Sequence, residues 1–214
     1  MSLACGIYSR PSLPDRLVPG ALRYHPDVIF FVTSVAGLAF GAGDQYLGSL
    51  KPMVALGPWT VSICQMSALW LLVPFAFGCT QDHPRRAMFL GLTATGAALA
   101  GYFVMTVSPM ESVPISQFPT AAVAMVGSNV LWILGGALTG PLFGLLGQRW
   151  RAQRWWASAA VSGGALLLEP LARHLRGQVI GPWWIWAVES TVGAGLLAAF
   201  VFVATLRPRP AETT

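Results

Sequence analysis

The sequence predicts an all-α integral membrane protein, a single bundle of six transmembrane helices with both termini in the cytoplasm. Two observations carry this prediction. Of the 214 residues, 55% are hydrophobic and only 10% are charged, whereas a soluble domain carries about 25% charged residues. Uninterrupted apolar runs, each with the roughly 20 residues that a helix needs to cross a bilayer, recur six times along the chain.

Each apolar run is interpreted as a helix because the runs are continuous, not alternating as in a transmembrane β-strand. A helix also satisfies its own backbone hydrogen bonds inside hydrocarbon. A basic, proline-containing cytoplasmic arm (1–26) without an early apolar core precedes the transmembrane domain (27–206), and a cytoplasmic tail (207–214) follows it. The polar, proline-punctuated segment 108–121 is expected to be an outer loop. The helices are expected near 27–47, 61–79, 87–107, 122–146, 156–174 and 182–206.

Lys and Arg residues are divided unevenly between the two sides of the predicted bundle. With a cytoplasmic N-terminus, ten of them lie on the cytoplasmic side and three, Lys51, Arg173 and Arg176, on the outer side. Basic loops are retained in the cytoplasm, so we expect a multi-pass protein of the cell membrane with both termini on the cytoplasmic side. The net charge of +5 is therefore interpreted as a topology signal carried by the loops between helices. We do not interpret it as a nucleic-acid-binding surface, and no nucleic-acid partner is expected.

Small residues recur every four positions on three of the predicted helices. Such ridges let helices approach closely in lipid, where no hydrophobic force drives them together. We interpret them as packing surfaces within the bundle. The alternative is that the glycine ridge of the first helix binds a membrane partner, because that helix lies at one end of the bundle order. The ridges are Thr33, Gly37 and Gly41; Gly136, Gly140 and Gly144; and Thr191, Gly195 and Ala199.

The strongly polar side chains within the predicted helices all fall in the outer half of the bundle. Glu189, for example, lies seven residues into the last helix, or about 10 Å deep. Several of them are in register with small residues and are therefore expected to point inward. Ionisable groups inside a membrane usually mark function. We expect an outer-leaflet pocket lined by Asp44, Gln65, Asn129, Glu169 and Glu189, with Trp132, Trp183 and Trp186 nearby.

These polar residues also have structural interpretations. Glu169 and Arg173 are four residues apart, in the order that favours an ion pair on one helix. Glu189 is either a neutral acid or the partner of an arginine on the outer side. Asp44 can simply end the first helix, and Asn129 can form a hydrogen bond that only serves packing.

Several kinds of chemistry leave no signature in the sequence. The three His residues are far apart and no His-x-x-x-His motif occurs, so no metal site is expected. There is no P-loop, and GAGDQY (41–46) departs from the dinucleotide-binding pattern at its last position. The three Cys residues form no disulfide framework, and no Gly-x-Ser-x-Gly motif is present. No cofactor is therefore expected.

Four apolar, glycine-rich segments resemble a little-characterised bacterial family of six-helix membrane proteins, a domain-of-unknown-function group. The resemblance extends over residues 34–175 and implies the fold and the topology, but no catalytic residue. The segments are SALWLLVPFAFG (67–78), RRAMFLGLTATGAALAGYF (85–103), GGALTGPLFGLLGQRW (135–150) and LLLEP (166–170).

The first functional hypothesis is a cofactor-independent cyclase or isomerase that acts on a membrane-dissolved isoprenoid. A neutral carboxylic acid in a dry site can protonate an epoxide or alkene, and aromatic faces stabilise the cation that follows. Glu189 is the expected acid, and Glu169 or Asp44 would hydrogen-bond to it or accept the final proton. In size and in its isolated acids, the chain is similar to membrane-embedded meroterpenoid and indole-terpenoid cyclases. SNVLWIL (128–134) has Ile133 where their Asn-x-x-Trp-Glu pattern has Glu.

The second hypothesis is a small-molecule transporter or its substrate-binding membrane subunit. Six helices, inside termini and a small-residue ridge on the first helix are similar to the substrate-binding subunits of energy-coupling-factor vitamin transporters. The same pocket would then capture a polar or cationic solute. A third hypothesis is a structural subunit without a ligand. The sparse, acidic and Trp-flanked polar set favours the enzyme.

Overall fold

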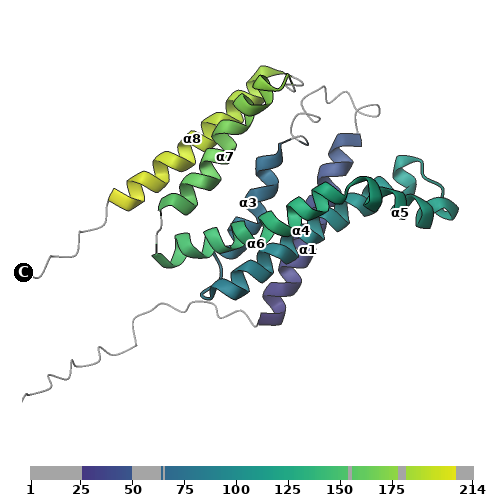
Figure 1. The fold of residues 1–214 in the computed structure, drawn as a ribbon, viewed down its shortest axis with the longest axis horizontal. Coiled ribbons are helices and arrows are strands. Elements are labelled where there is room, and N and C mark those ends of the chain that lie inside the picture. The colour runs from purple at the N-terminus through teal and green to yellow at the C-terminus, as the bar shows by residue number, and fades with distance from the viewer. Residues whose placement is uncertain (1–25, 50–63, 65, 154–155, 178–181, 206–214) are drawn as a thin grey trace, which may run out of the picture.

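The chain is helical throughout the part that the structure describes. In the computed structural model the described residues are 26–49, 64, 66–153, 156–177 and 182–205. They form seven α-helices and contain no strand (Figure 1). Two 3-10 turns, η2 (Pro109–Glu111) and η3 (Ile115–Gln117), lie between α4 and α5. The helices are α1 (Pro26–Ser49), α3 (Ser67–Gly78), α4 (Pro84–Thr106), α5 (Phe118–Ser128), α6 (Val130–Gln153), α7 (Trp156–Leu175) and α8 (Trp183–Thr205).

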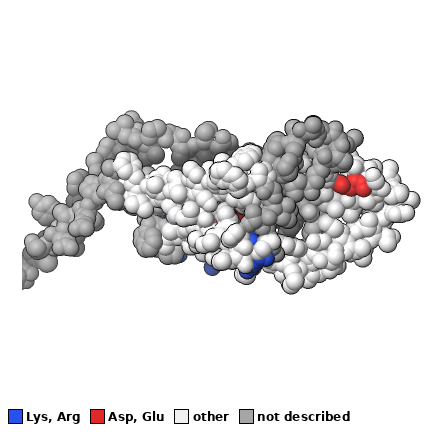
Figure 2. Space-filling model, turned by 90° about the horizontal axis from the view of Figure 1, so that it is seen from above, with Lys and Arg blue, Asp and Glu red and all other residues white. Residues whose placement is uncertain are grey.

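Four of these helices, α1, α4, α6 and α8, are long and apolar enough to cross a membrane, and α3 is a shorter apolar helix. Large apolar side chains such as Phe31, Leu131 and Val201 remain exposed on them, as expected where lipid replaces water. In the space-filling view the described surface is mostly uncharged, and acidic and basic atoms are confined to small patches (Figure 2). The prediction of an all-helical protein with several helices suited to a membrane is confirmed.

The centre of the bundle is α4, which packs against α1 on one side and α6 on another. Gly41 of α1 touches the backbone of α4 so closely that an added Cβ would overlap the carbonyl group of Ala98. Gly37 lies one turn earlier, against Ala94 and Ala97 of α4. The small-residue ridge of the first helix is therefore used inside the bundle, and α4 already occupies the positions that a partner helix would take.

The glycine ridge of α6 packs against α4, as predicted. Gly140 lies against the backbone of Gly91, and Gly144 against that of Ala87. At the end of α3, Gly78 approaches Gly144 in the same way. A hydrophobic cluster of Phe75, Phe143, Leu146 and Trp150 also joins α3 to α6. These contacts unite α1, α3, α4 and α6 through backbone approaches that larger side chains would prevent.

The last two helices form an antiparallel hairpin beside this core (Figure 1). Their contact is tight at Gly193, where an added Cβ would lie 2.7 Å from the backbone nitrogen of Leu167. The ridge predicted on this helix, Thr191, Gly195 and Ala199, is exposed instead, so that expectation was wrong. α8 is apolar on every side and has small residues on two faces, that of Gly193 and that of Thr191, Gly195 and Ala199. Hydropathy does not distinguish these faces, and the close fit to α7 selects the face of Gly193.

The helix predicted near 122–146 is interrupted at Asn129. Its side-chain amide donates a hydrogen bond of 2.9 Å to the carbonyl oxygen of Met125, and the hydroxyl of Ser128 donates to the same oxygen at 3.1 Å. Such side chains compete with the backbone for helical carbonyl groups. The backbone of Asn129 departs from the helix, with φ of −112° and ψ of 18°. α5 therefore ends at Ser128 and α6 begins at Val130, which corrects the expectation of one continuous helix.

One end of the bundle brings together the elements that form the candidate site. We call it the upper end, defined by the last turns of α1 and α7 and the first turns of α3 and α8 (Figure 1). At the opposite, lower end, α8 touches the core through an edge-to-face contact between Trp150 and Phe200, whose ring centroids are 4.4 Å apart. The α7–α8 hairpin is thus attached to the core at both ends.

Candidate functional site

The first turn of α3 is capped by a carboxylate from another helix. Glu169 of α7 accepts hydrogen bonds from the backbone nitrogens of Ser67, at 2.8 Å, and Ala68, at 2.7 Å. The first backbone N–H groups of a helix have no partner within that helix, and the positive end of the helix dipole attracts an anion. No side chain of the residue preceding α3 supplies this cap. Glu169 therefore joins α7 to the start of α3.

The same carboxylate forms an ion pair with Arg173, one turn later on α7. The Nε and Nη2 atoms of Arg173 each lie 2.7 Å from the Oε1 atom of Glu169. Nη2 also donates a hydrogen bond of 2.9 Å to the hydroxyl of Ser67. The ion pair that the four-residue spacing suggested is therefore formed, and it belongs to a network that also includes α3.

Glu189 of α8 lies beside this network but outside its hydrogen bonds. The residue is 3% exposed, and no donor among the described residues lies within hydrogen-bond distance of its carboxyl oxygens. The nearest carboxyl group is that of Glu169, which is close enough to share a proton with a protonated Glu189. The carboxylate of Glu169 and the guanidinium of Arg173 are close enough to interact with it electrostatically. A buried carboxyl group without donors is costly as an anion, so the neutral, protonated form suits this position.

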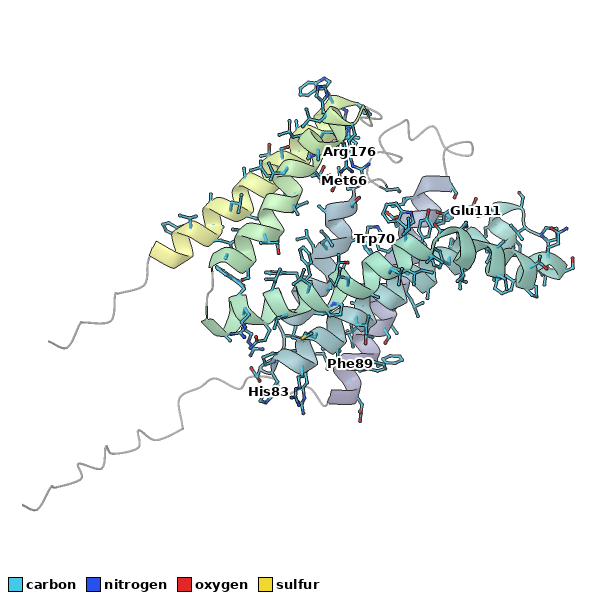
Figure 3. The ribbon with its side chains drawn as sticks, in the orientation of Figure 1. Met66, Trp70, His83, Phe89, Glu111 and Arg176 are labelled. Atoms are coloured by element: carbon cyan, nitrogen blue, oxygen red, sulfur yellow. The ribbon has the colours of Figure 1, made fainter. Side chains whose placement is uncertain are left out.

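An apolar lining surrounds the first turn of α8, between Glu189 and the upper end. Trp186 is 5% exposed and packs with Ile185 and with Met66, which directly precedes α3. The guanidinium carbon of Arg173 lies 5.6 Å from the centre of the Trp186 ring, within the range of a cation–π contact. Figure 3 shows Met66 at the top of α3, close to the end of α7. Trp186 therefore lies in the same part of the structure as the ion pair of Glu169 and Arg173.

Asp44 lies in a second polar cluster, on the side of α3 that faces α1 and α4. Its side chain interacts with those of Trp70 and Cys64, and the Cys64 thiol donates a hydrogen bond of 3.0 Å to its backbone carbonyl. Trp70 forms edge-to-face contacts with Phe40 of α1 and Tyr102 of α4. Asp44 thus has a set of partners different from those of Glu169 and Glu189.

Glu111 of η2 lies close to the second cluster, as Trp70 and Glu111 show in Figure 3. Its carboxylate accepts hydrogen bonds from the hydroxyl of Ser49 and, at 3.3 Å, from the amide of Gln45. These contacts fasten the loop after α4 to the last turn of α1. They account for Glu111 as a structural residue.

The remaining predicted site residues are placed elsewhere. Asn129 donates its side-chain hydrogen bonds to Met125 and Ser128, within α5. Trp132 is 69% exposed on α6 and Trp183 is 75% exposed at the start of α8, and Gln65 lies outside the described residues. Of the predicted set, the structure brings together Glu169, Glu189 and Trp186.

Two parts of the site were not singled out from the sequence. Ser67, as the first residue of an apolar run, is a helix-start signal, but nothing in the sequence indicates that Glu169 faces it. Met66 carries no chemical signal at all. Ser67 contacts Glu169, which is 102 positions away, and Met66 packs against Ile185 and Trp186 of α8. A local sequence pattern cannot indicate contacts over such separations.

The donor set limits what the site can hold. Among the described residues, no group of three His, Cys, Asp or Glu side chains is arranged to bind a metal ion. The site instead combines a capped ion pair, a buried carboxyl group and apolar side chains, which suits proton transfer or binding of an organic cation. No family model, curated protein or solved structure matches this chain.

Proposed function

We propose that the protein is a membrane-embedded cyclase or isomerase that protonates an isoprenoid substrate with Glu189. A single observation carries the proposal: Glu189 is 3% exposed and its carboxyl oxygens accept no hydrogen bond from the described residues, while the neighbouring Glu169 carboxylate is held by α3 and Arg173. A buried acid that accepts no hydrogen bond, and that lies beside a second carboxylate already paired with the nearby arginine, retains its proton and can deliver it.

The proposed reaction needs no cofactor. The Glu189 O–H bond breaks as its proton moves to an epoxide oxygen, and the epoxide C–O bond opens to leave a carbocation. The electron pair of an internal alkene forms a new C–C bond to that carbon, which moves the positive charge along the chain. A C–H bond of the final cation then breaks and returns a proton to the Glu189 carboxylate, so the substrate is isomerised and the acid restored.

In this proposal the other two acids do not donate the proton. Glu169 is a positioning residue, because both its oxygens are held by α3 and Arg173. Its negative charge next to Glu189 opposes a second ionised carboxylate at the same place. Asp44, with partners of its own, is assigned no step. Trp186, one turn before Glu189 on α8, provides a buried aromatic surface, although Arg173 already lies over its ring.

We further propose that the protein crosses the cell membrane six times, with α6 as the fourth span and the upper end of the bundle outside. The lower end is basic: it holds Arg85 and Arg86 at the start of α4 and Arg149 and Arg151 at the end of α6. Arg151 connects the end of α6 to the segment between α3 and α4. Its Nη2 atom lies 3.3 Å from the Asp82 carboxylate, and its Nη1 atom donates a hydrogen bond of 2.6 Å to the carbonyl oxygen of Thr80. Clustering of basic residues at one end supports a cytoplasmic location for that end.

The function is tested with membranes from cells that produce the protein. These membranes are incubated with terminally epoxidised farnesyl and geranylgeranyl chains, and cyclised isomers of unchanged mass are sought by chromatography and mass spectrometry. Glu189→Gln should lower conversion by about 100-fold or more, the usual contribution of a general acid. Thr191→Val is the matched control, because Thr191 is exposed on the same helix and its hydroxyl donates to the Ala187 carbonyl of that helix.

Two results would contradict the proposal. Conversion by Glu189→Gln at the wild-type rate would remove the residue from the chemistry. Uptake of a solute into vesicles without chemical change would favour the transporter hypothesis, in which the same carboxyl group binds the solute. In a transporter built on a second membrane subunit, the partner would have to use a face of α1 other than Gly37 and Gly41, which contact α4.

A further inference from the structure

The charges around Glu189 leave room for one positive charge. Glu169 and Arg173 neutralise each other at 2.7 Å, and the first turn of α3 presents only the uncharged Ser67 and Ala68 to this network. Within α8, the adjacent turn contributes the uncharged Ile185 and Trp186. Once Glu189 releases its proton, these described groups therefore carry a net charge of one negative unit.

The chemistry of the site selects an organic cation over a metal ion. A metal ion needs several ligand atoms in a fixed geometry, and the described residues provide no suitable group. An ammonium group needs one hydrogen-bond acceptor and an apolar surrounding for its substituents. Glu189 provides two unoccupied oxygens, and Met66, Ile185 and Trp186 provide buried apolar surface nearby.

We propose that the Glu189 carboxylate binds the ammonium group of a hydrophobic amine. The neutral amine arrives through the lipid, its nitrogen takes the proton as the Glu189 O–H bond breaks, and an ammonium–carboxylate pair remains. This inference rests on the proposed function, because an ammonium ion mimics the carbocation that a cyclase stabilises. Its test involves no turnover, however, so the two ideas can fail separately.

The test uses purified full-length protein and dicyclohexylcarbodiimide, a hydrophobic reagent that adds to protonated carboxyl groups. The extent of addition at Glu189 is measured by mass spectrometry, with total addition at the other carboxyl groups of the protein as the internal reference. Dimethyldodecylamine should suppress addition at Glu189 and leave addition at the other carboxyl groups unchanged. The carbon isostere of this amine, with CH in place of nitrogen, should not reduce carbodiimide addition at any carboxyl group. Equal protection by both compounds, or none by the amine, would overturn the proposal.

Direct binding of radiolabelled dimethyldodecylamine provides the second measurement. Glu189→Gln should bind it about 30-fold more weakly, the smaller end of the loss expected when one partner of a buried charge pair is removed. Thr191→Val should bind it as the wild type does. Equal affinity of Glu189→Gln and wild type would refute the site. Amine binding at Glu189 without conversion of any epoxide would support the amine site and contradict the cyclase. Conversion of an epoxide without amine binding would support the cyclase and contradict the amine site.

Discussion

The carboxylate of Glu169 lies 2.7 Å from the backbone nitrogen of Ala68, so a residue of α7 completes the first turn of α3. The two residues are 101 positions apart in the sequence. This contact, together with the ion pair to Arg173, holds the α7–α8 hairpin against the core at the upper end and keeps Glu189 next to a fixed negative charge.

Replacing Glu169 should destabilise the protein even though the side chain does not donate the catalytic proton. Glu169→Ala removes the cap of α3 and leaves Arg173 without its carboxylate, at an expected cost of about 2–4 kcal/mol. Thermal unfolding in detergent measures the loss. Ser67→Ala is the matched control, because it removes one hydroxyl contact but keeps the capped backbone N–H, and should cost about 1 kcal/mol. Equal effects of the two changes would contradict the capping role.

The contact between α1 and α4 should not tolerate even one methyl group at Gly41. Gly41→Ala forces a Cβ into the Ala98 carbonyl and should cost about 1–3 kcal/mol. Two residues later, an added Cβ at Gly43 meets nothing within 4 Å, so Gly43→Ala should be neutral or stabilising by up to about 1 kcal/mol. Unfolding temperatures of the two variants would distinguish them. A stable Gly41→Ala protein would show that α1 packs differently.

On α8, two neighbouring glycines should respond in opposite directions. Gly193 is pressed against Leu167 and Gly163 of α7, whereas nothing lies within 4 Å of a Cβ at Gly195. Gly193→Ala is therefore expected to weaken the hairpin by about 1–3 kcal/mol, and Gly195→Ala to leave the free energy of unfolding unchanged or improved. If Gly195→Ala were the less stable of the two variants, Thr191, Gly195 and Ala199 would be the packing ridge after all.

Cysteine labelling can test which end of the bundle faces outward. In a background without the native cysteines, a membrane-impermeant maleimide should label Arg176→Cys in intact cells, because Arg176 lies at the upper end (Figure 3). Arg85→Cys, at the start of α4, should react only after the cells are permeabilised. Labelling in the opposite pattern would invert the topology while leaving the fold unchanged.

Helix content and the local ion pair were predictable because both depend on near neighbours in the sequence. A helix that spans lipid needs only a sufficiently long apolar run, and the pairing of Glu169 with Arg173 needs only a separation of four residues. The ridge of Gly136, Gly140 and Gly144 was also found correctly, since three glycines in register leave few other packing faces on that helix. The break at Asn129 was missed, because the apolar run continues through it and the non-helical backbone of this one residue leaves no mark in the hydropathy.

By itself, the sequence determined that this chain forms apolar helices suited to a membrane and that its few acids fall in particular turns of those helices. Only the tertiary structure decided that Glu169 caps α3, that Glu189 is buried without a partner, and that Asp44 joins Trp70 and Tyr102 in a different cluster. The physical reason is that an apolar helix can rotate about its axis with little change in its affinity for lipid. Close backbone contacts such as Gly193 against Leu167 select the rotation, and the rotation determines which polar groups meet.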